Sequence, residues 1–446
     1  SQCFNITTFN TFYKIMGSFE NPTGFSACLC VSLPFFVVFQ LLNENKQIRY
    51  LVCFLGIIVV IAIVLSYSRA GIISVAIVIA IFLFQKLKQK RIWKYLLLCS
   101  SLILLLFGCY WMKKNSADGR LLIWQCGINM VKDAPWIGHG LGSFEAHYMD
   151  YQANFFKQCG QSRFSMLADN VKQPFNEYLG LLLNFGIIGL LVLLLLMVII
   201  IYCYRKNPSV EKQIAFYSLS SIGIFSFFSY PFAYPFVWVV TFLSIIITSE
   251  YIKPLFSNIL IKKIACMFIL TYSLFGSSKL FERIQAELDW GKASTLALCK
   301  SYNETLPTYE RLEKMFVSNP YFLYNYAAVL QEMKQYTESL EVALKCRQYW
   351  ADYDLELIIG ENYQQLNKPE LAEKYYNSAS MMCPSRFLPL YKLFHLYKTN
   401  GEKERSLAMA EAVISKPMKI KTTTIRMMKR EMEREIQKMN MSIKLE

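Results

Sequence analysis

Residues 50–85 read YLVCFLGIIVVIAIVLSYSRAGIISVAIVIAIFLFQ, two apolar runs that are interrupted only by the hexapeptide SYSRAG at residues 66–71. A helix needs about 20 mainly apolar residues to cross the roughly 30 Å of hydrocarbon in a bilayer. Each run therefore predicts a membrane-spanning helix. The hexapeptide predicts a tight turn between the two helices, with Arg69 at the membrane surface.

Other segments of the chain have a similar composition, and 54% of its 446 residues are hydrophobic. The eight predicted spans are residues 26–42, 50–67, 70–85, 95–112, 178–203, 214–230, 235–249 and 264–276, the last of which is short. From about residue 277 the chain becomes polar and charged. The predicted fold class is all-α, with a polytopic transmembrane helix bundle at 1–276 and a soluble α-solenoid at 277–446.

The net charge of +15 is concentrated in alternate short connections between the predicted spans. These connections carry Lys46, Arg49, Lys86, Lys88, Lys90, Arg91, Lys94, Arg205, Lys206, Lys212, Lys253, Lys262 and Lys263. Because basic loops stay in the cytoplasm, the long loop at 113–177 and the tail are expected outside. The chain is thus expected to be a multi-pass protein of the bacterial inner membrane, with a periplasmic C-terminal domain. Basic charge in short loops beside a membrane argues against nucleic acid as a partner.

The tail carries an internal repeat whose period matches the 34 residues of a tetratricopeptide repeat. One copy contains Gly360, Tyr363, Ala372, Tyr376, Ala379 and Pro384. A copy shifted by one period contains Phe394, Tyr397, Ser406, Ala410 and Val413, and a weaker copy runs from Asn319 to Ala343. A single helix pair cannot bury its apolar face, so stacked copies predict a small solenoid. Such a scaffold suggests a protein partner.

The outer loop at 113–177 has two recognisable parts. Apolar residues recur at helical spacing between Leu121 and Val131, which predicts an amphipathic helix. The stretch GHGLG at 138–142 has the glycine density of a tight turn. It lacks the Lys-Ser/Thr ending of a nucleotide-binding loop and lies on the wrong side of the membrane for ATP. No cofactor is therefore expected.

Metal and disulfide chemistry have little support among the 13 cysteines, most of which lie in predicted spans. No Cys-x-x-Cys or His-x-x-x-His spacing occurs in the sequence. Cys126 and Cys159 share the outer loop, where either a disulfide or two free thiols is compatible with a periplasmic location. The Asp-x-Asp of Asp352 and Asp354 lies in the repeats and is interpreted as solvated helix surface. No metal is therefore expected.

Several pieces of the chain, in their order, resemble the O-antigen ligase and polysaccharide polymerase family. They are Gly17–Pro22, Ser68–Gly71, Gly119-Arg120 with Trp124, Pro135–Phe144, and Asn176–Leu179 followed by Phe185–Gly189. The resemblance covers nearly all of residues 15–250. It implies a metal-independent glycosyltransferase that moves a glycan from undecaprenyl diphosphate to an acceptor hydroxyl on lipid A core, a growing glycan or a protein. Family members usually have more than eight spans, so further helices before Ser1 are expected.

The resemblance also implies which residues act in the reaction. Arg69 and Arg120 stand at motif arginines and would bind the diphosphate and stabilise its developing charge. A guanidinium suits this role because it is always charged and binds phosphate oxygens through two parallel hydrogen bonds.

The general base is left open, because Phe175 stands where many family members have histidine. His139 in the glycine turn and Glu177 are the candidates, and a reaction without a strong base is the alternative. Asn176 is expected to bind substrate by orienting the acceptor, a role that Glu177 could share.

Two functions from other classes are also compatible with the sequence. A transporter or flippase for the same lipid would need charged residues within several spans, and the predicted spans are nearly free of them. A non-catalytic scaffold would use the repeats to recruit envelope proteins. The motifs at Arg69 and Arg120 argue against a scaffold, whereas the missing histidine keeps it open.

Overall fold

The computed structural model describes residues 15–17, 19, 21–42, 44–86, 100, 103–105, 107–160, 162–249 and 259–443. Within these ranges the regular structure is helical and contains no β-strand, which confirms the all-α prediction. The chain divides into two compact units, and each is described by itself. Unit 1 comprises Ser1–Trp124, Val131–Leu141 and Gln173–Pro254, and unit 2 comprises Gln125–Met130, Gly142–Lys172 and Leu255–Glu446.

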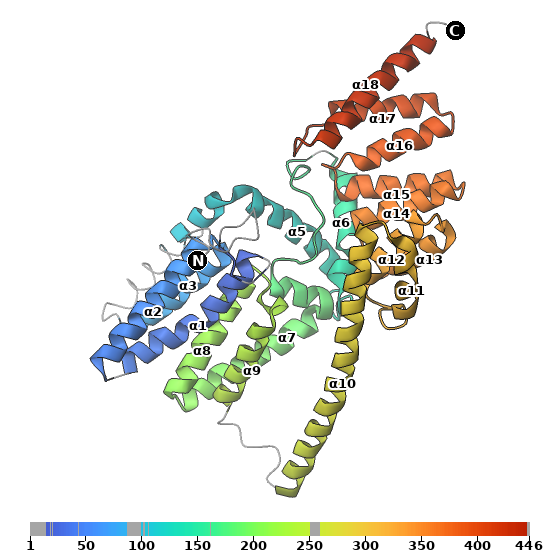
Figure 1. Ribbon diagram of the computed structural model, residues 1–446. Coiled ribbons are helices and arrows are strands. Elements are labelled where there is room, and N and C mark those ends of the chain that lie inside the picture. The colour runs from blue at the N-terminus through green and yellow to red at the C-terminus, as the bar shows by residue number, and fades with distance from the viewer. Residues whose placement is uncertain are drawn as a thin grey trace. The chain divides into compact units, whose positions relative to one another are not determined.

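Unit 1 is a bundle of mainly apolar helices in which α8 has a central place (Figure 1). Its elements are α1 (Pro22–Leu42), α2 (Lys46–Leu65), α3 (Arg69–Lys86), the first part of α5 (Lys114–Asp133), α7 (Glu177–Lys206), α8 (Val210–Ser226), the short 3₁₀ helix η2 (Pro231–Ala233) and α9 (Pro235–Ser249). Helix α8 packs against α1, α3, α7 and α9.

Small polar side chains join α8 to α1 and α3. The Ser74 hydroxyl donates to the carbonyl oxygen of Ser221 at 3.0 Å, and the Ser221 hydroxyl donates to the carbonyl oxygen of Cys30 at 3.0 Å. Ser218 donates in the same way to the carbonyl oxygen of Val31 at 3.1 Å. Serine allows helix backbones to approach closely and to form hydrogen bonds in apolar surroundings, where packing drives helix association.

Four described helices are long and apolar enough to cross a membrane. They are Pro22–Gln40 within α1, Lys46–Leu65, Glu177–Lys206 and Ile259–Leu298. Shorter apolar helices at Arg69–Ala80, Ile103–Met112 and Pro235–Ser249 fall in three other predicted spans. The chain is therefore a membrane protein. Much of the predicted span 95–112, with the basic residues from Lys88 to Lys94, lies outside the described residues.

Unit 2 is a stack of helix pairs. Its helices are α6 (Ser143–Cys159), α10 (Ile259–Leu298), α11 (Tyr302–Leu312), α12 (Pro320–Glu332), α13 (Tyr336–Arg347), α14 (Tyr353–Gln365), α15 (Pro369–Met382), α16 (Leu388–Thr399), α17 (Lys403–Ser415) and α18 (Thr423–Ile443). The three predicted repeats correspond to the pairs α12–α13, α14–α15 and α16–α17, so the prediction of a helical repeat domain is confirmed.

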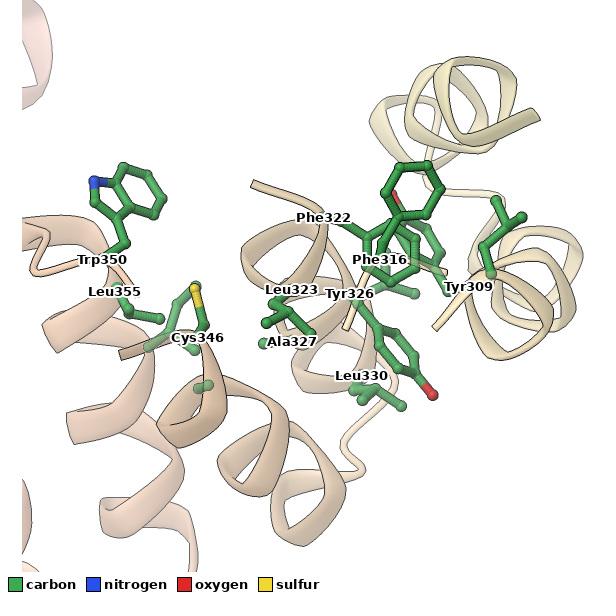
Figure 2. Packing of buried hydrophobic residues seen from close by; sticks show 14 of the residues in the cluster. Tyr309, Phe316, Phe322, Leu323, Tyr326, Ala327, Leu330, Cys346, Trp350 and Leu355 are labelled. Carbon is green, nitrogen blue, oxygen red and sulfur yellow. The ribbon is translucent and has the colours of Figure 1, made fainter. Parts of the chain in front are cut away.

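Aromatic residues dominate the first part of the repeat core. Figure 2 shows Tyr309, Phe316 and Phe322 gathered between the helices, and the rings of Phe316 and Phe322 stack with centroids 4.9 Å apart. The repeat glycine has a packing role, because a Cβ at Gly360 would lie 2.6 Å from the ring of Tyr376. A small residue on one helix thus receives the aromatic residue of the next helix.

Helix α6 of the outer loop packs on the repeats, chiefly on α15. The Gln152 side chain is fully buried and donates to the carbonyl oxygen of Met382 at 2.6 Å. Farther along the loop, Asp169 forms an ion pair with Arg386 at 2.6 Å. The second half of the outer loop therefore groups with the repeats, which the sequence does not predict. The domain limits at 1–276 and 277–446 stay a prediction.

Two features of unit 2 bear on expectations from the sequence. Asp352 is only 3% exposed, and its carboxylate accepts hydrogen bonds from the backbone amides of Asp354 at 2.8 Å and Leu355 at 3.3 Å. The interpretation of Asp352 as solvated helix surface is wrong, because this side chain caps the first turn of α14. Cys126 and Cys159 are both free thiols.

Candidate functional site

Arg69 is the first residue of α3 and directly follows the tight turn between α2 and α3. The turn is closed by the Ser68 hydroxyl, which accepts from the backbone amide of Gly71 at 3.4 Å. The Arg69 guanidinium donates to the carbonyl oxygen of Lys113 at 3.2 Å and to the Ser116 hydroxyl at 2.8 Å. The turn therefore holds this guanidinium against the start of α5.

Arg120 lies on α5, the helix that contains the predicted amphipathic segment. Its guanidinium donates to the carbonyl oxygen of Phe228 and lies 5.0 Å from the centre of the Phe175 ring. Burial, followed by the positive charge of Arg69, lowers the pKa of Arg120 to about 10. The side chain therefore remains a cation at neutral pH.

Lys113 completes a cluster of three cations with Arg69 and Arg120. Its ammonium group donates to the carbonyl oxygen of Tyr67 at 3.0 Å, and burial, followed by the charges of Arg69 and Arg120, lowers the pKa of Lys113. The acceptors that these three side chains use are backbone carbonyls and one hydroxyl. Among the residues that the structure describes, no carboxylate forms an ion pair with any of the three. Such a cluster creates a positive potential that favours an anion.

A cavity of about 180 Å³ lies beside Arg69 and Arg120. Its other lining residues are mainly apolar or aromatic: Ile73, Cys109, Tyr110, Ala117, Leu121, Trp124 and Phe228. Guanidinium groups in an apolar wall act in a medium of lower effective dielectric constant, where they attract an anion more strongly than in water. The cavity is therefore suited to an anionic group that is attached to an apolar chain.

Phe175 occupies the position for which the family resemblance implies histidine. Its backbone is in the left-handed region with φ +53°, which is uncommon for a bulky residue. The ring lies against the Arg120 guanidinium and edge-on to the ring of Tyr230, with 5.4 Å between the ring centroids. The preceding carbonyl, of Pro174, accepts from the indole nitrogen of Trp124 at 3.0 Å. These contacts place the start of α7 beside the cation cluster.

Asn176 and Glu177 follow directly and begin α7. The Asn176 side-chain oxygen caps the helix by accepting from the backbone amide of Leu179 at 3.0 Å. One carboxylate oxygen of Glu177 accepts from the backbone amide of Phe232 at 3.1 Å, in η2. Neither residue lines the cavity described above, although both adjoin Phe175.

His139 lies in the predicted glycine turn, which docks on α7. The backbone amides of His139 and Gly140 donate to the carbonyl oxygens of Leu183 at 2.8 Å and Asn184 at 3.0 Å. Helix α7 is interrupted at Gly186, where φ is +61° and a Cβ would lie 2.3 Å from the backbone of Trp136, just before the glycine turn. The turn thus supplies hydrogen bonds at the point where α7 breaks. His139 is not among the residues that line the cavity of Arg69 and Arg120.

The structure brings together Arg69, Arg120 and the segment that contains Asn176 and Glu177, and it adds three residues that the sequence analysis missed. These are Lys113, Phe228 and Tyr230. Lys113 could have been found as a cation that opens the outer loop shortly before Arg120. Phe228 and Tyr230 follow α8 in a segment without any pattern that marks a site.

A comparison with protein families finds a match. Residues 54–194 match the O-antigen ligase family. The match confirms the resemblance over this part of the chain and contains Arg69, Arg120, His139, Asn176 and Glu177. The match supports a general role in glycan transfer, as a glycosyltransferase-type enzyme.

The other comparisons add little to the O-antigen ligase match. The search of curated proteins finds no match. A crystal structure of MamA protein is 13% identical, with a match that covers 34% of this chain and 89% of that chain at a TM-score of 0.28. At that score the likeness carries no argument, so the assignment of the repeats rests on the helix pairs themselves.

Proposed function

We propose that the O-antigen ligase domain transfers a glycan from undecaprenyl diphosphate to an acceptor hydroxyl at the outer face of the bacterial inner membrane. The observation that carries this proposal is the cluster of Arg69, Lys113 and Arg120, which has no carboxylate partner among the described residues and adjoins an apolar cavity. The diphosphate would bind to the cations, and the start of the polyprenyl chain would lie against the apolar wall.

The proposed reaction assigns a role to each cation. The bond between the anomeric carbon and the diphosphate oxygen breaks, and its electron pair remains on the diphosphate. The acceptor oxygen bonds to the anomeric carbon and loses its proton. Because negative charge grows on the leaving oxygen, fixed cations stabilise the transition state more than the bound donor. Arg69 and Arg120 supply this charge without a metal ion, and Lys113 reinforces it.

The proton acceptor is assigned to Glu177 in preference to His139. Glu177 is two residues from Phe175, which contacts Arg120, and the hydrogen bond from Phe232 occupies one of its two carboxylate oxygens. His139 uses its backbone to dock the glycine turn on α7. Asn176 would orient the acceptor from the same segment. Loss of the proton after the donor bond has broken would make a strong base unnecessary.

The acceptor is lipid A core, a growing glycan or a protein. Basic connections between the spans support a periplasmic location for the outer loop and the repeats. The packing of α6 on α15 supports a role of the repeats in binding an acceptor or partner protein, because residues Gly142–Lys172 of the outer loop belong to the same unit as the repeats.

Replacement of Arg120 tests this proposal. Arg120→Ala should lower the rate of glycan transfer by about 10²–10³, the usual cost of removing one preorganised charge contact. Arg120→Lys should recover only part of the rate, because it keeps the charge and loses the two-pronged geometry. Lys132→Ala removes an exposed cation from the same helix and should leave the rate near the parental value.

The assay should use purified protein in detergent with a radiolabelled lipid-linked donor. A flippase has no membrane to act across in detergent, so transfer that depends on Arg120 supports the transferase over the transporter. A parental rate for Arg120→Ala would contradict the proposed role of the cluster. Absence of any transfer by the parent protein with each of the three acceptor classes would favour the scaffold.

A further inference from the structure

The Arg120 side chain is held by few hydrogen bonds although it is largely enclosed. In the part of the chain that the structure describes, its guanidinium donates one hydrogen bond, to the carbonyl oxygen of Phe228. A guanidinium has five N–H donors, so the protein leaves most of them unused. One hydrogen bond leaves a long side chain several rotamers, and their loss on ligand binding opposes that binding. A second contact would therefore preorganise the guanidinium for an anion.

The ring of Phe175 supplies a second contact. The Cζ atom of the Arg120 guanidinium lies 5.0 Å from the centre of this ring. A cation is attracted to the face of an aromatic ring, and the attraction is stronger where the pair is withdrawn from water. The contact requires none of the N–H donors and does not neutralise the charge. It therefore differs from an ion pair, which would compete with a bound anion.

The backbone at Phe175 has an uncommon conformation for a bulky residue, with φ +53° in the left-handed region. Such a residue persists only where its surroundings fix it, and residues of this kind cluster at functional sites. Both neighbours of Phe175 are held in place. The carbonyl oxygen of Pro174 accepts from the indole of Trp124 at 3.0 Å, and Asn176 caps the start of α7. The segment therefore fixes the direction in which the ring leaves the backbone.

A second aromatic ring packs against Phe175. The ring of Tyr230 lies edge-on to it, with centroids 5.4 Å apart. Tyr230 is itself held, because its hydroxyl accepts from the Asn21 amide at 3.5 Å and its ring stacks on Tyr234 with centroids 6.4 Å apart. The Tyr234 hydroxyl donates to the side-chain oxygen of Asn21 at 3.2 Å. All of these residues belong to unit 1, and together they restrain the Phe175 ring beside Arg120.

We propose that Phe175 is a positioning residue, whose ring holds the Arg120 guanidinium at the cavity with its N–H donors available to a diphosphate. Arg120 lines the cavity and Phe175 does not, so the ring acts through the arginine. The inference rests on the proposed function for the identity of the anion. Its effect should be largest in the transition state, where negative charge on the leaving oxygen grows.

A double-mutant cycle between Phe175 and Arg120 tests this role in the full-length protein in detergent. Phe175→Leu removes the ring and keeps a bulky apolar side chain on the same backbone. It should lower kcat for glycan transfer about five- to thirtyfold, the range of a partly desolvated cation–π contact, with a smaller change in KM. Phe175→Tyr should recover most of the rate, because it keeps the ring face. In the Arg120→Ala background, Phe175→Leu should lower the rate by less than about twofold, because the contact is already absent.

Phe227→Leu is the matched control. The Phe227 ring is exposed and lies 4.3 Å from the ring of Tyr178, so its loss removes an aromatic contact that does not involve Arg120. This variant should keep kcat near the parental value. An equal fall caused by Phe175→Leu with and without Arg120 would indicate a general structural effect and would overturn the proposal. A parental kcat for Phe175→Leu would overturn it as well.

Binding of a labelled polyprenyl diphosphate separates this inference from the proposed function, because it requires no transfer. Phe175→Leu should weaken this binding about five- to thirtyfold, and only when Arg120 is present. That coupling, in a parent protein that transfers no glycan, would support the positioning role and contradict the transferase. Transfer that depends on Arg120 but not on Phe175 would overturn the positioning role and leave the transferase in place. A parent protein that neither binds the diphosphate nor transfers a glycan would overturn both.

Discussion

Arg347 of unit 2 and Arg120 of unit 1 are both largely enclosed, but they have different kinds of partner. In unit 2, the Arg347 guanidinium forms ion pairs with Asp150 of α6 and with Glu356 of α14. In unit 1, Arg120 has a carbonyl oxygen and an aromatic ring as partners. Removing a charge from water is costly unless an opposite charge accompanies it. Unit 2 therefore uses charge to hold its own parts together, whereas Arg120 of unit 1 has no carboxylate partner among the described residues, as the proposed binding of an anion requires.

Among the variants that test this contrast, Arg347→Ala should have the largest effect on stability. This variant leaves two carboxylates without their cation, and the Glu356 side chain is only 2% exposed. Breaking a buried pair by removing one partner typically costs about 3–5 kcal/mol. The reactivity of the buried thiols of Cys346 and Cys383, measured by mass spectrometry on the full-length chain, should rise by about 100-fold or more.

Arg386→Ala is the matched control within unit 2. Arg386 pairs with Asp169, but both side chains are largely exposed, at 51% and 41%. An exposed pair contributes about 0–1 kcal/mol. Thiol reactivity that rises as much for Arg386→Ala as for Arg347→Ala would show that burial does not separate the two pairs. The contrast between the units would then lose its basis.

Asp352 is an exception to this contrast, because it is a buried carboxyl group of unit 2 whose hydrogen-bond partners are backbone amides and not an opposite charge. Burial, followed by the nearby charge of Asp354, raises the pKa of Asp352 to about 6. The folded protein thus holds a proton that the unfolded chain has released, between the ordinary carboxyl pKa of 3.8 and about 6. Stability from this group is therefore present at low pH and is lost as the pH rises through 6.

Asp352→Asn should stabilise unit 2 at pH 8, because asparagine keeps the cap and carries no charge. The gain in unfolding free energy should approach about 3 kcal/mol and should disappear below about pH 4. Hydrogen exchange of the α14 amides, corrected for intrinsic rates at each pH, measures it. A variant less stable than the parent at pH 8 would mean that the carboxylate is stabilising in its ionised form.

The sequence predicts the parts of this fold that depend on local patterns. Hydropathy locates α2 and α3, and the 34-residue period locates the repeats, because Gly360 and Tyr376 keep a spacing that one helix pair determines. The docking of α6 on α15 leaves no such trace. It depends on contacts such as Gln152 with Met382, between residues far apart in the chain, and on the burial of a polar side chain that resembles a solvated one in sequence.

The residues of the candidate site are likewise of two kinds, those that a sequence motif predicts and those that only the structure reveals. Arg69 and Arg120 are predictable because they belong to motifs, and an arginine beside a membrane helix is rare enough to suggest a function. Lys113 resembles any loop cation until the structure brings it to the carbonyl of Tyr67. The burial of Asp352 could not be predicted either, since a helix cap and a surface acid have the same sequence signature. Folding decides which of these charges are enclosed.

The smallest effect concerns Lys113, whose lowered pKa should make its charge sensitive to alkaline pH. Burial, followed by the charges of Arg69 and Arg120, lowers its pKa below the ordinary lysine value of 10.5. Arg120, with a pKa of about 10, keeps its proton up to about pH 9. Deprotonation takes the cluster from three positive charges to two. Affinity for the donor diphosphate should therefore fall on the alkaline side, at a pH below that at which a free lysine titrates.

The expected fall is modest because the Lys113 side chain is only partly desolvated and keeps enough contact with solvent for its charge to be screened. One such charge contributes about 0.5–1 kcal/mol, or about two- to fivefold in affinity. Binding of a labelled polyprenyl diphosphate between pH 7 and 9, below the pKa of about 10 of Arg120, would measure it. Lys113→Arg should remove the alkaline decline, since arginine stays charged, and Lys113→Ala should bind weakly at every pH. A decline that persists unchanged in Lys113→Arg would assign it to another group. The positive charge of unit 1 would then be fixed by its two arginines alone, and Lys113 would serve only to close the turn at Tyr67.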